Sequence, residues 1–230
     1  MGLPRFAVVD LETSGFSTRR HRILQLGVVI VDADGHVADE WSTLVRLRWP
    51  LSRVGPTEVH GLHRRDLRGA PAIDEVLDQF LERTAGAVFT AHNSRFDGEF
   101  IDAAISRSRR LHVERTSPVA VAAAPVASSG PSDESTLGPF GRRLCTLRMS
   151  RRLDPDRQLS HRLADVCARY EVALDRPHDA LADATATAQV LPHLLRAHGV
   201  TEVGDLEPFF DRPPPGGRGD GGRRRRRRRQ

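Results

Sequence analysis

The sequence predicts an α/β fold, in which strands share one sheet and helices cover it. Residues 6–9 form a short apolar run typical of a buried strand, and residues 23–31 are dense in Val, Ile and Leu. The Asp-Gly pair at 34–35 is typical of a hairpin turn, so residues 37–47 are expected to return as an antiparallel strand. Between Pro71 and Leu81 the apolar residues recur at helical spacing, which predicts an amphipathic helix.

The remainder of the chain continues this alternation. We expect strands over 87–91 and 142–146, and helices from about 94 to 110, from 146 to 153, over 163–170, and from 179 into the 190s. Pro192 is expected to kink or end the last helix because it lacks a backbone N–H. Together these elements predict one domain over residues 1–200.

Two stretches lack the periodicity of a packed element. Residues 111–139 are rich in Ala, Val, Pro and Ser, and this composition predicts a flexible low-complexity insertion. Residues 201–230 are rich in Pro, Gly and Arg and are predicted to form a disordered tail. The net charge of the chain is +5, but the seven arginines at 223–229 exceed it, which leaves a charge of −2 on residues 1–222. The tail is therefore the expected source of general attraction to polyanions.

The composition argues against several classes of protein. Two cysteines, Cys145 and Cys167, are too few for a disulfide framework, and nothing beside them indicates a zinc site. No window approaches the ~20 apolar residues of a membrane helix, and no apolar stretch precedes Asp10 as a signal peptide would. The expectation is a cytoplasmic protein that does not enter a membrane.

Two acids follow the first apolar run, at Asp10 and Glu12. Strand side chains alternate between faces, so these two carboxylates would project together while Leu11 packs on the other side. Carboxylates held this close repel each other unless a proton or a cation lies between them. Taken alone, the pair could also be a strand end with two hydrated acids.

Three further residues make the catalytic interpretation stronger. Asp97 begins a predicted helix, while His178 and Asp183 flank the start of the last one. Four carboxylates gathered at one point require cations, and two divalent ions are the usual arrangement for phosphoryl displacement. A histidine, which titrates near neutrality, is suited to taking a proton from an attacking water. Asp179 is predicted to be the N-cap of the last helix.

These residues lie in three segments that resemble a known family. Asp-Leu-Glu-Thr-Ser-Gly at 10–15, His-Asn-Ser-Arg-Phe-Asp at 92–97 and His-Asp-Ala-Leu-Ala-Asp at 178–183 are similar to the exonuclease motifs of the DnaQ-like DEDDh family. That family includes the proofreading epsilon subunit of bacterial DNA polymerase III. The resemblance covers about residues 5–197 and implies an RNase H-like fold, with a five-stranded mixed sheet flanked by helices.

The resemblance also implies roles for individual residues. Asp10, Glu12, Asp97 and Asp183 would bind two Mg²⁺ or Mn²⁺ ions, and His178 would be the general base. The residues expected to contact or shape the substrate pocket are Thr13, Gly15, His60, Leu62, Asn93 and Phe96. Among these, His60 can equally be a supporting loop residue.

The implied activity is a metal-dependent 3′→5′ exonuclease that releases nucleoside 5′-monophosphates from single-stranded or frayed DNA, in proofreading or repair. An RNA-directed enzyme of the same fold, similar to RNase T or to an oligoribonuclease, is the alternative, because DNA and RNA differ by the 2′-OH. A non-catalytic nucleic-acid-binding or polymerase-associated subunit is less favoured, since all five motif residues are present. The expected partners are nucleic acid and, in the first interpretation, a DNA polymerase.

Overall fold

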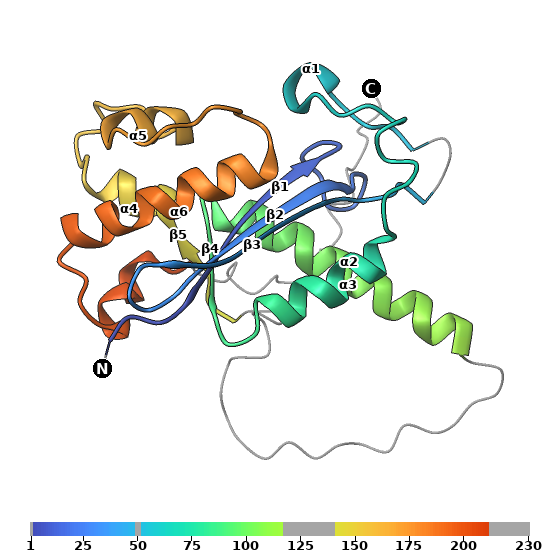
Figure 1. The fold of residues 1–230 in the computed structure, drawn as a ribbon, viewed down its shortest axis with the longest axis horizontal. Helices are drawn as coiled ribbons and strands as arrows, with labels where there is room; N and C mark the ends of the chain where they lie inside the picture. The colour runs from blue at the N-terminus through green and yellow to red at the C-terminus, as the bar shows by residue number, and fades with distance from the viewer. Residues whose placement is uncertain (1, 49–51, 117–140, 212–230) are drawn as a thin grey trace, which may run out of the picture.

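The computed structural model describes residues 2–48, 52–116 and 141–211. A single five-stranded sheet crosses the molecule, with helices on both of its faces (Figure 1). The strand order is β3-β2-β1-β4-β5, so the strand that carries Asp10 and Glu12 is central. The predicted α/β class and the five-stranded mixed sheet are confirmed.

The strands follow the predicted order along the chain. Their bounds are β1 Phe6–Thr13, β2 Ile23–Val31, β3 Val37–Leu44, β4 Val88–Ala91 and β5 Leu144–Cys145. β1, β2 and β3 pair antiparallel, whereas β4 is parallel to β1 and β5 is parallel to β4. The ends of β1 and β4 therefore lie at the same edge of the sheet, where an acid on one can face an acid that follows the other.

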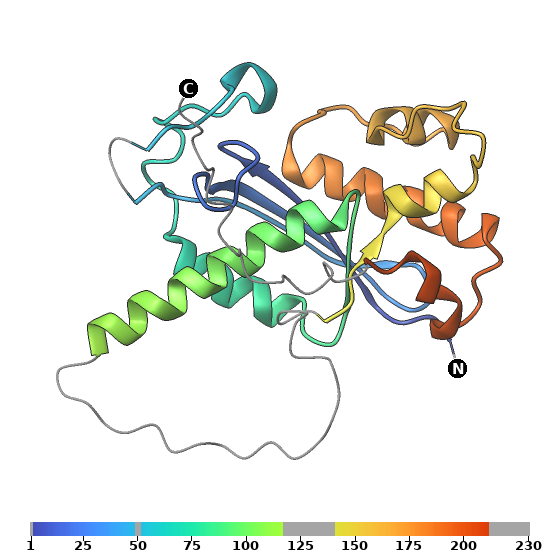
Figure 2. The same cartoon turned by 180° about the vertical axis from the view of Figure 1, so that it is seen from behind.

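The helices form two layers. Their bounds are α1 Thr57–His60, α2 Ile73–Arg83, α3 Ser94–Thr116, α4 Thr146–Arg152, α5 Leu163–Arg169 and α6 Ala180–Ala197, followed by the 3₁₀-helix η2 Val203–Phe209. α2 and α3 cover one face, and α4, α5 and α6 lie on the other (Figures 1 and 2). In the described part of the chain, no helix is long and apolar enough to cross a membrane.

Alternation along β1 divides the hydrophobic core between these layers. Ala7, Val9 and Leu11 pack toward α2 and α3, whereas Phe6 and Val8 pack toward α6. Asp10 and Glu12 continue the second series, so their side chains emerge on the α6 face beyond its apolar part. The expected opposition of Leu11 to the two acids is confirmed.

Close backbone contact brings α6 onto this face. Gly27 of β2 pairs with Asp10 and faces the first residue of α6. A Cβ at Gly27 would lie 2.3 Å from the Ala180 carbonyl oxygen, so no other residue fits without displacing the helix. Gln25, two residues away on the same face, accepts a hydrogen bond from the Ala180 N–H at 3.4 Å and donates to Asp179 Oδ2 at 3.3 Å. These contacts fix the N-terminus of α6 over the central strands.

Several predicted boundaries were wrong. β1 continues through Glu12 to Thr13 because β2 supplies backbone partners along its whole length. β3 ends at Leu44, and β5 is reduced to two residues because Thr146 already begins α4. The last helix ends at Ala197, within the predicted range, so Pro192 does not end it; the buried side chains of Leu194 and Leu195 hold the final turn against the core.

The structure also shows packing beyond the predicted division at residue 200. Residues 201–211 belong to the domain, since η2 buries Leu206 and Phe209, and Phe210 forms an isolated β-bridge with Leu144. The composition of the following Pro-Gly-Arg stretch obscured these three apolar residues. α3 extends to Thr116, six residues past the predicted helix end at about 110 and into the stretch predicted as an insertion. The remainder of that insertion and the arginine-rich tail lie outside the described residues.

We expect Gly27→Ala to destabilise the protein by about 1–3 kcal/mol, the usual cost of forcing extra volume into a packed site. The added methyl group meets backbone atoms of Ala180, which cannot rotate away as a side chain would. Denaturant titration measures the change in unfolding free energy. Gly69→Ala is the matched control, because a Cβ there has no neighbour within 4 Å. Equal stability of the two variants would contradict the close contact.

Candidate active site

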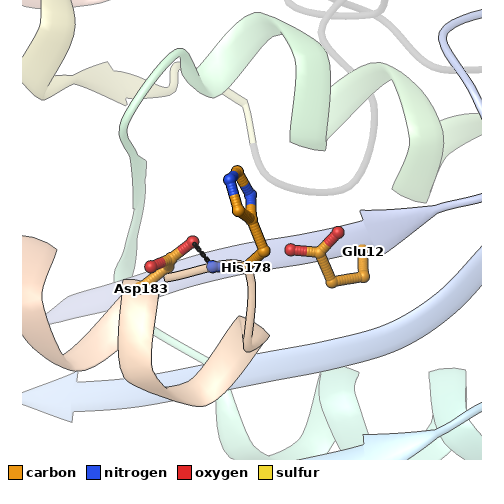
Figure 3. A group of neighbouring side chains, drawn as sticks. All are labelled: Glu12, His178 and Asp183. Carbon is orange, nitrogen blue, oxygen red and sulfur yellow. Dashed lines mark hydrogen bonds between the residues drawn. The ribbon is translucent and has the colours of Figure 1, made fainter. Parts of the chain in front are cut away.

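The site lies where the end of β1 meets the N-terminus of α6. Glu12 points from β1 toward His178, and Asp183 lies on the other side of the histidine (Figure 3). One ligand atom from each of these three residues lies within 4.8 Å of the other two. Glu12 and Asp183 are 8% and 9% exposed, so their carboxylates are largely withdrawn from water, whereas His178 is exposed.

The first turn of α6 places two of these residues. Asp179 accepts a hydrogen bond from the Ala182 N–H at 3.1 Å, which confirms the predicted N-cap. Asp183 follows one turn later, near the helix N-terminus that lies against Gly27 of the sheet. His178 precedes the cap with φ of 66°, and its backbone N–H donates to Asp183 Oδ2 at 3.1 Å. This left-handed conformation is uncommon for histidine and fixes the position of the side chain beside the acids.

Asp97 approaches from the opposite layer. It is 3% exposed in the first turn of α3, where a backbone hydrogen bond from Leu11 links it to β1. The buried Arg143 lies against the next residue, Gly98, and forms an ion pair with Asp102 one turn further along α3. A side chain at position 98 would collide with that guanidinium, so the glycine allows Arg143 to support the start of the helix.

Burial and mutual repulsion act together on the four acids. Burial raises the pKa of Asp10 well above its usual range, and Asp97, Asp183 and Glu12 raise it further. The pKa of Glu12 is raised to about 8, mainly by burial and then by Asp183. Burial likewise raises the pKa of Asp97 to about 8 against the lowering effect of backbone N–H groups, and it raises the pKa of Asp183. Without a counter-charge, the site therefore favours protonated carboxyl groups.

A divalent cation fits this arrangement of donors. Asp183 Oδ1 is buried and has no hydrogen-bond partner among the described residues, so an electron pair is left available beside Glu12. Carboxylate oxygens are the ligands that Mg²⁺ and Mn²⁺ prefer. The structure thus groups Glu12, Asp183 and His178 as possible metal ligands, whereas Asp10 and Asp97 are linked to that group through their electrostatic coupling.

The residues predicted to contact substrate divide into two groups, one of them at the end of β1. The Thr13 hydroxyl donates to the Gly15 carbonyl at 2.9 Å and is occupied in the turn. Gly15 has φ of 144°, and a Cβ there would lie 2.7 Å from the His21 ring. Both residues therefore shape the start of the loop between β1 and β2.

The second group borders the site from α1 and α3. His60 is buried, its Nδ1 accepts from the Leu62 N–H at 3.1 Å, and Leu62 packs with Val54 and Leu67. Burial lowers the pKa of His60, and nearby histidines that include His178 lower it further, so α1 lies within electrostatic range of the site. Observed contacts give His60 and Leu62 a supporting position.

Asn93 and Phe96 lie at the start of α3. Asn93 is exposed with φ of 82°, which is typical of a turn asparagine, and Phe96 is half-buried against Phe100, with ring centroids 5.0 Å apart. Sequence analysis missed Phe16, which follows Gly15, is 89% exposed, and contacts the edge of Phe96 at 6.3 Å between centroids. The sequence did offer a signal for an exposed ring: Phe16 directly follows the glycine of a turn, where few buried residues are near enough to cover an aromatic side chain.

Comparison with known proteins bears on this site. The model of the Exonuclease family RNase_T matches residues 7–191, a span that contains all five motif residues. The chain is 32% identical over 190 residues to the PolC-type DNA polymerase III of Caldanaerobacter subterraneus subsp. tengcongensis. It is 34% identical over 203 residues to a putative bifunctional exonuclease/endonuclease protein of Mycobacterium tuberculosis. The matches cover 83% and 84% of this chain, but only 11% and 27% of those relatives.

Solved structures share the fold at lower identity. Exonuclease X in complex with 5′ overhanging duplex DNA has a TM-score of 0.57 at 21% identity, and the match covers 89% of this chain and 96% of that one. The nuclease domain of 3′hExo, a DEDDh family member bound to rAMP, has a TM-score of 0.64 at 13% identity, with coverage of 91% and 97%. The architecture is therefore that of the DEDDh nucleases. The family model and the relatives show that this chain belongs to the exonuclease family, in agreement with its DnaQ-like motifs, and the solved structures show that its fold is RNase H-like.

Proposed function

We propose that the protein removes nucleotides from the 3′ ends of single-stranded or frayed DNA and releases nucleoside 5′-monophosphates. The supporting observation is the convergence of Glu12, Asp183 and His178, in which a buried Asp183 oxygen has no hydrogen-bond partner among the described residues. A site for hydrolysing phosphodiesters needs this concentration of negative charge only if cations offset it. Exposed Phe16 beside Phe96 supports a strand with unpaired bases, because bases stack on aromatic rings regardless of sequence.

The proposed roles follow from position. Asp10, Glu12, Asp97 and Asp183 would hold two Mg²⁺ or Mn²⁺ ions, which when bound stabilise the charge that develops on the attacked phosphate. His178 takes the proton from the attacking water, since its ring is exposed beside Glu12 and Asp183. Thr13 and Gly15 shape the turn against which the terminal nucleotide lies, whereas Asn93 and Phe96 border it from α3. His60 and Leu62 form the facing wall.

Association with a DNA polymerase is part of the same proposal. Its support is the similarity to PolC-type polymerases, of which this chain spans about a tenth. Co-purification with the polymerase of the same cell tests it. A role in proofreading requires that complex, whereas a role in repair does not.

The activity is tested with purified protein, Mg²⁺ and 5′-labelled substrates in parallel. We expect stepwise shortening of single-stranded DNA from the unlabelled end, slower shortening of a fully paired duplex, and slower loss of RNA. Electrophoresis resolves both the polarity and the relative rates. Release of the label as a mononucleotide before any shortened products appear would contradict the polarity, and faster degradation of RNA would make the enzyme an exoribonuclease.

His178→Asn should reduce turnover by about 10²–10⁴-fold, the usual contribution of a general base. Asparagine tolerates the left-handed backbone at this position, so the loop and the N–H contact to Asp183 are preserved. The loss should shrink at higher pH, where hydroxide replaces the missing base. Single-turnover rates across pH measure this, with the exposed His36→Asn in the distant hairpin as control. Wild-type turnover at neutral pH would remove His178 from this role.

The metal-free protein should lose stability as pH rises between about 4, the pKa of an unfolded carboxyl group, and about 8. Across this window the folded acids retain protons that the unfolded chain releases, so unfolding becomes easier with pH. Asp97→Asn should flatten this dependence, because one repelling group is gone. Asp34→Asn should not, since the pKa of that exposed acid is lowered. Thermal unfolding in EDTA measures both variants, and identical slopes would contradict the coupling.

A further inference from the structure

A strongly basic hollow lies between the loop that joins β1 and β2, the chain after β3, and α3. Its volume is about 830 Å³, within the usual range for ligand sites. It is lined by six arginines and one carboxylate, Asp74. The arginines are Arg20, Arg22, Arg46, Arg48, Arg53 and Arg107. They come from three segments: the loop between β1 and β2, the chain after β3, and α3. A fold that gathers arginines from separate segments presents a site for a ligand with several negative charges.

Three of these arginines have side chains that are available to bind a ligand. In the described ranges, the exposed side chains of Arg20, Arg46 and Arg53 have no hydrogen-bond or ion-pair partner. A second basic hollow beside α4 differs, because Asp154 and Asp211 line it and Arg148 already pairs with Asp211 at 3.3 Å. Five arginines face two carboxylates in that hollow, whereas six arginines face one carboxylate in the first, so the first has the larger excess of positive charge.

The floor of the first hollow is apolar. Ile23, Val45 and Ala104 are buried residues that line it, and the hydroxyls of Ser52 and Ser108 lie among the arginines. An apolar floor within a basic rim matches the two parts of a nucleotide, a flat base and its phosphate. A paired base could not enter, because its partner strand would accompany it. The chemistry therefore favours an unpaired nucleotide.

The loop between β1 and β2 connects this hollow with the catalytic acids. Near Asp97 the loop contacts α3 through Phe16 and Phe96, and further along α3 the Arg107 guanidinium donates to the Thr18 carbonyl. Asp97 and Ala104 are seven residues apart on α3, or about 10 Å along its axis. A nucleotide in the hollow is thus too far away to be the one cleaved, yet close enough to belong to the same strand.

We propose that this hollow binds an unpaired nucleotide of the substrate strand upstream of its 3′ end, with the base on the apolar floor and the phosphates against the arginines. The proposal rests on the proposed function, since the ligand is the same strand that the acids cleave. It makes an extended single strand, longer than a dinucleotide, the preferred substrate.

The binding test compares two triple variants by fluorescence anisotropy with a labelled single-stranded oligonucleotide of about 16 nucleotides, in Ca²⁺ to prevent cleavage. Arg20→Gln, Arg46→Gln and Arg53→Gln are combined in the hollow. Arg65→Gln, Arg68→Gln and Arg162→Gln, all exposed and outside it, remove the same charge. Each lost phosphate contact lowers the slope of log K against log salt by about 0.7, so the hollow variant should lose about 2. Equal slopes for the two variants would overturn the proposal.

A blunt duplex separates unpaired from paired ligands. The hollow variant should lose more affinity than the control variant for the single strand, and no more than the control variant for the duplex. Equal extra losses for both DNA forms would overturn the assignment of an unpaired base. A third outcome would also overturn the assignment: the hollow variant loses affinity for a nucleoside monophosphate but binds the oligonucleotide as the control variant does. The hollow would then be a site for free nucleotide.

Turnover in Mg²⁺ distinguishes this proposal from the proposed function. The ratio of kcat/KM for the long oligonucleotide to that for a dinucleotide should fall in the hollow variant and not in the control variant. If the hollow variant is active and its ratio is unchanged, the proposal for the hollow is wrong and the proposed function still stands. If the wild-type protein degrades neither substrate, the proposed function fails, while the anisotropy measurement still decides whether the hollow binds the strand.

Discussion

The site depends on the contact between the backbone of α6 and the backbone of β2 at Gly27. Helices that cover a sheet are usually held away by side chains on both elements, and here one side chain is absent. Because that side chain is absent, the start of α6 lies closer to the sheet, and Asp183 and His178 lie beside Glu12. Gln25 then fixes the angle of the helix through its hydrogen bonds to Asp179 and Ala180. Without this approach, the acids of β1 would face solvent and would have no histidine beside them.

The rest of the fold stabilises what this approach assembles. Gathering four acids in a desolvated position opposes folding, and the raised pKa values of Asp10, Glu12, Asp97 and Asp183 are the measure of that opposition. Two apolar layers, one on each face of the sheet, offset it. Arg143 contributes from the flank, where it lies against Gly98 and holds the helix that carries Asp97. The hydrophobic core thus stabilises the fold against the repulsion between the acids, and bound cations would relieve that repulsion.

Much of this was predictable because the relevant signals are local. Alternation along β1 placed Asp10 and Glu12 on one face and Leu11 on the other, and the cap at Asp179 followed from residue type. Contacts between distant segments were not predictable. Nothing near Gly27 in the sequence indicates that a helix 150 residues later rests on it. The same holds for Leu206 and Phe209, whose place in the core was obscured by the Pro-Gly-Arg stretch that follows them. The substrate roles of Thr13, His60 and Leu62 stay predictions.

The separation of Glu12 and Asp183 along the chain has a consequence for biosynthesis. β1, β2 and β3 pair through short connections and can form early, whereas α6 contacts β1 and β2 across a long stretch of intervening chain. Because chains emerge from the ribosome N-terminus first, the acids of β1 exist without Asp183 or His178 until α6 has been synthesised. A nascent chain that ends before α6 therefore has no complete site, although ribosomal and messenger RNA surround it. The site is assembled only after α6 docks on β1 and β2.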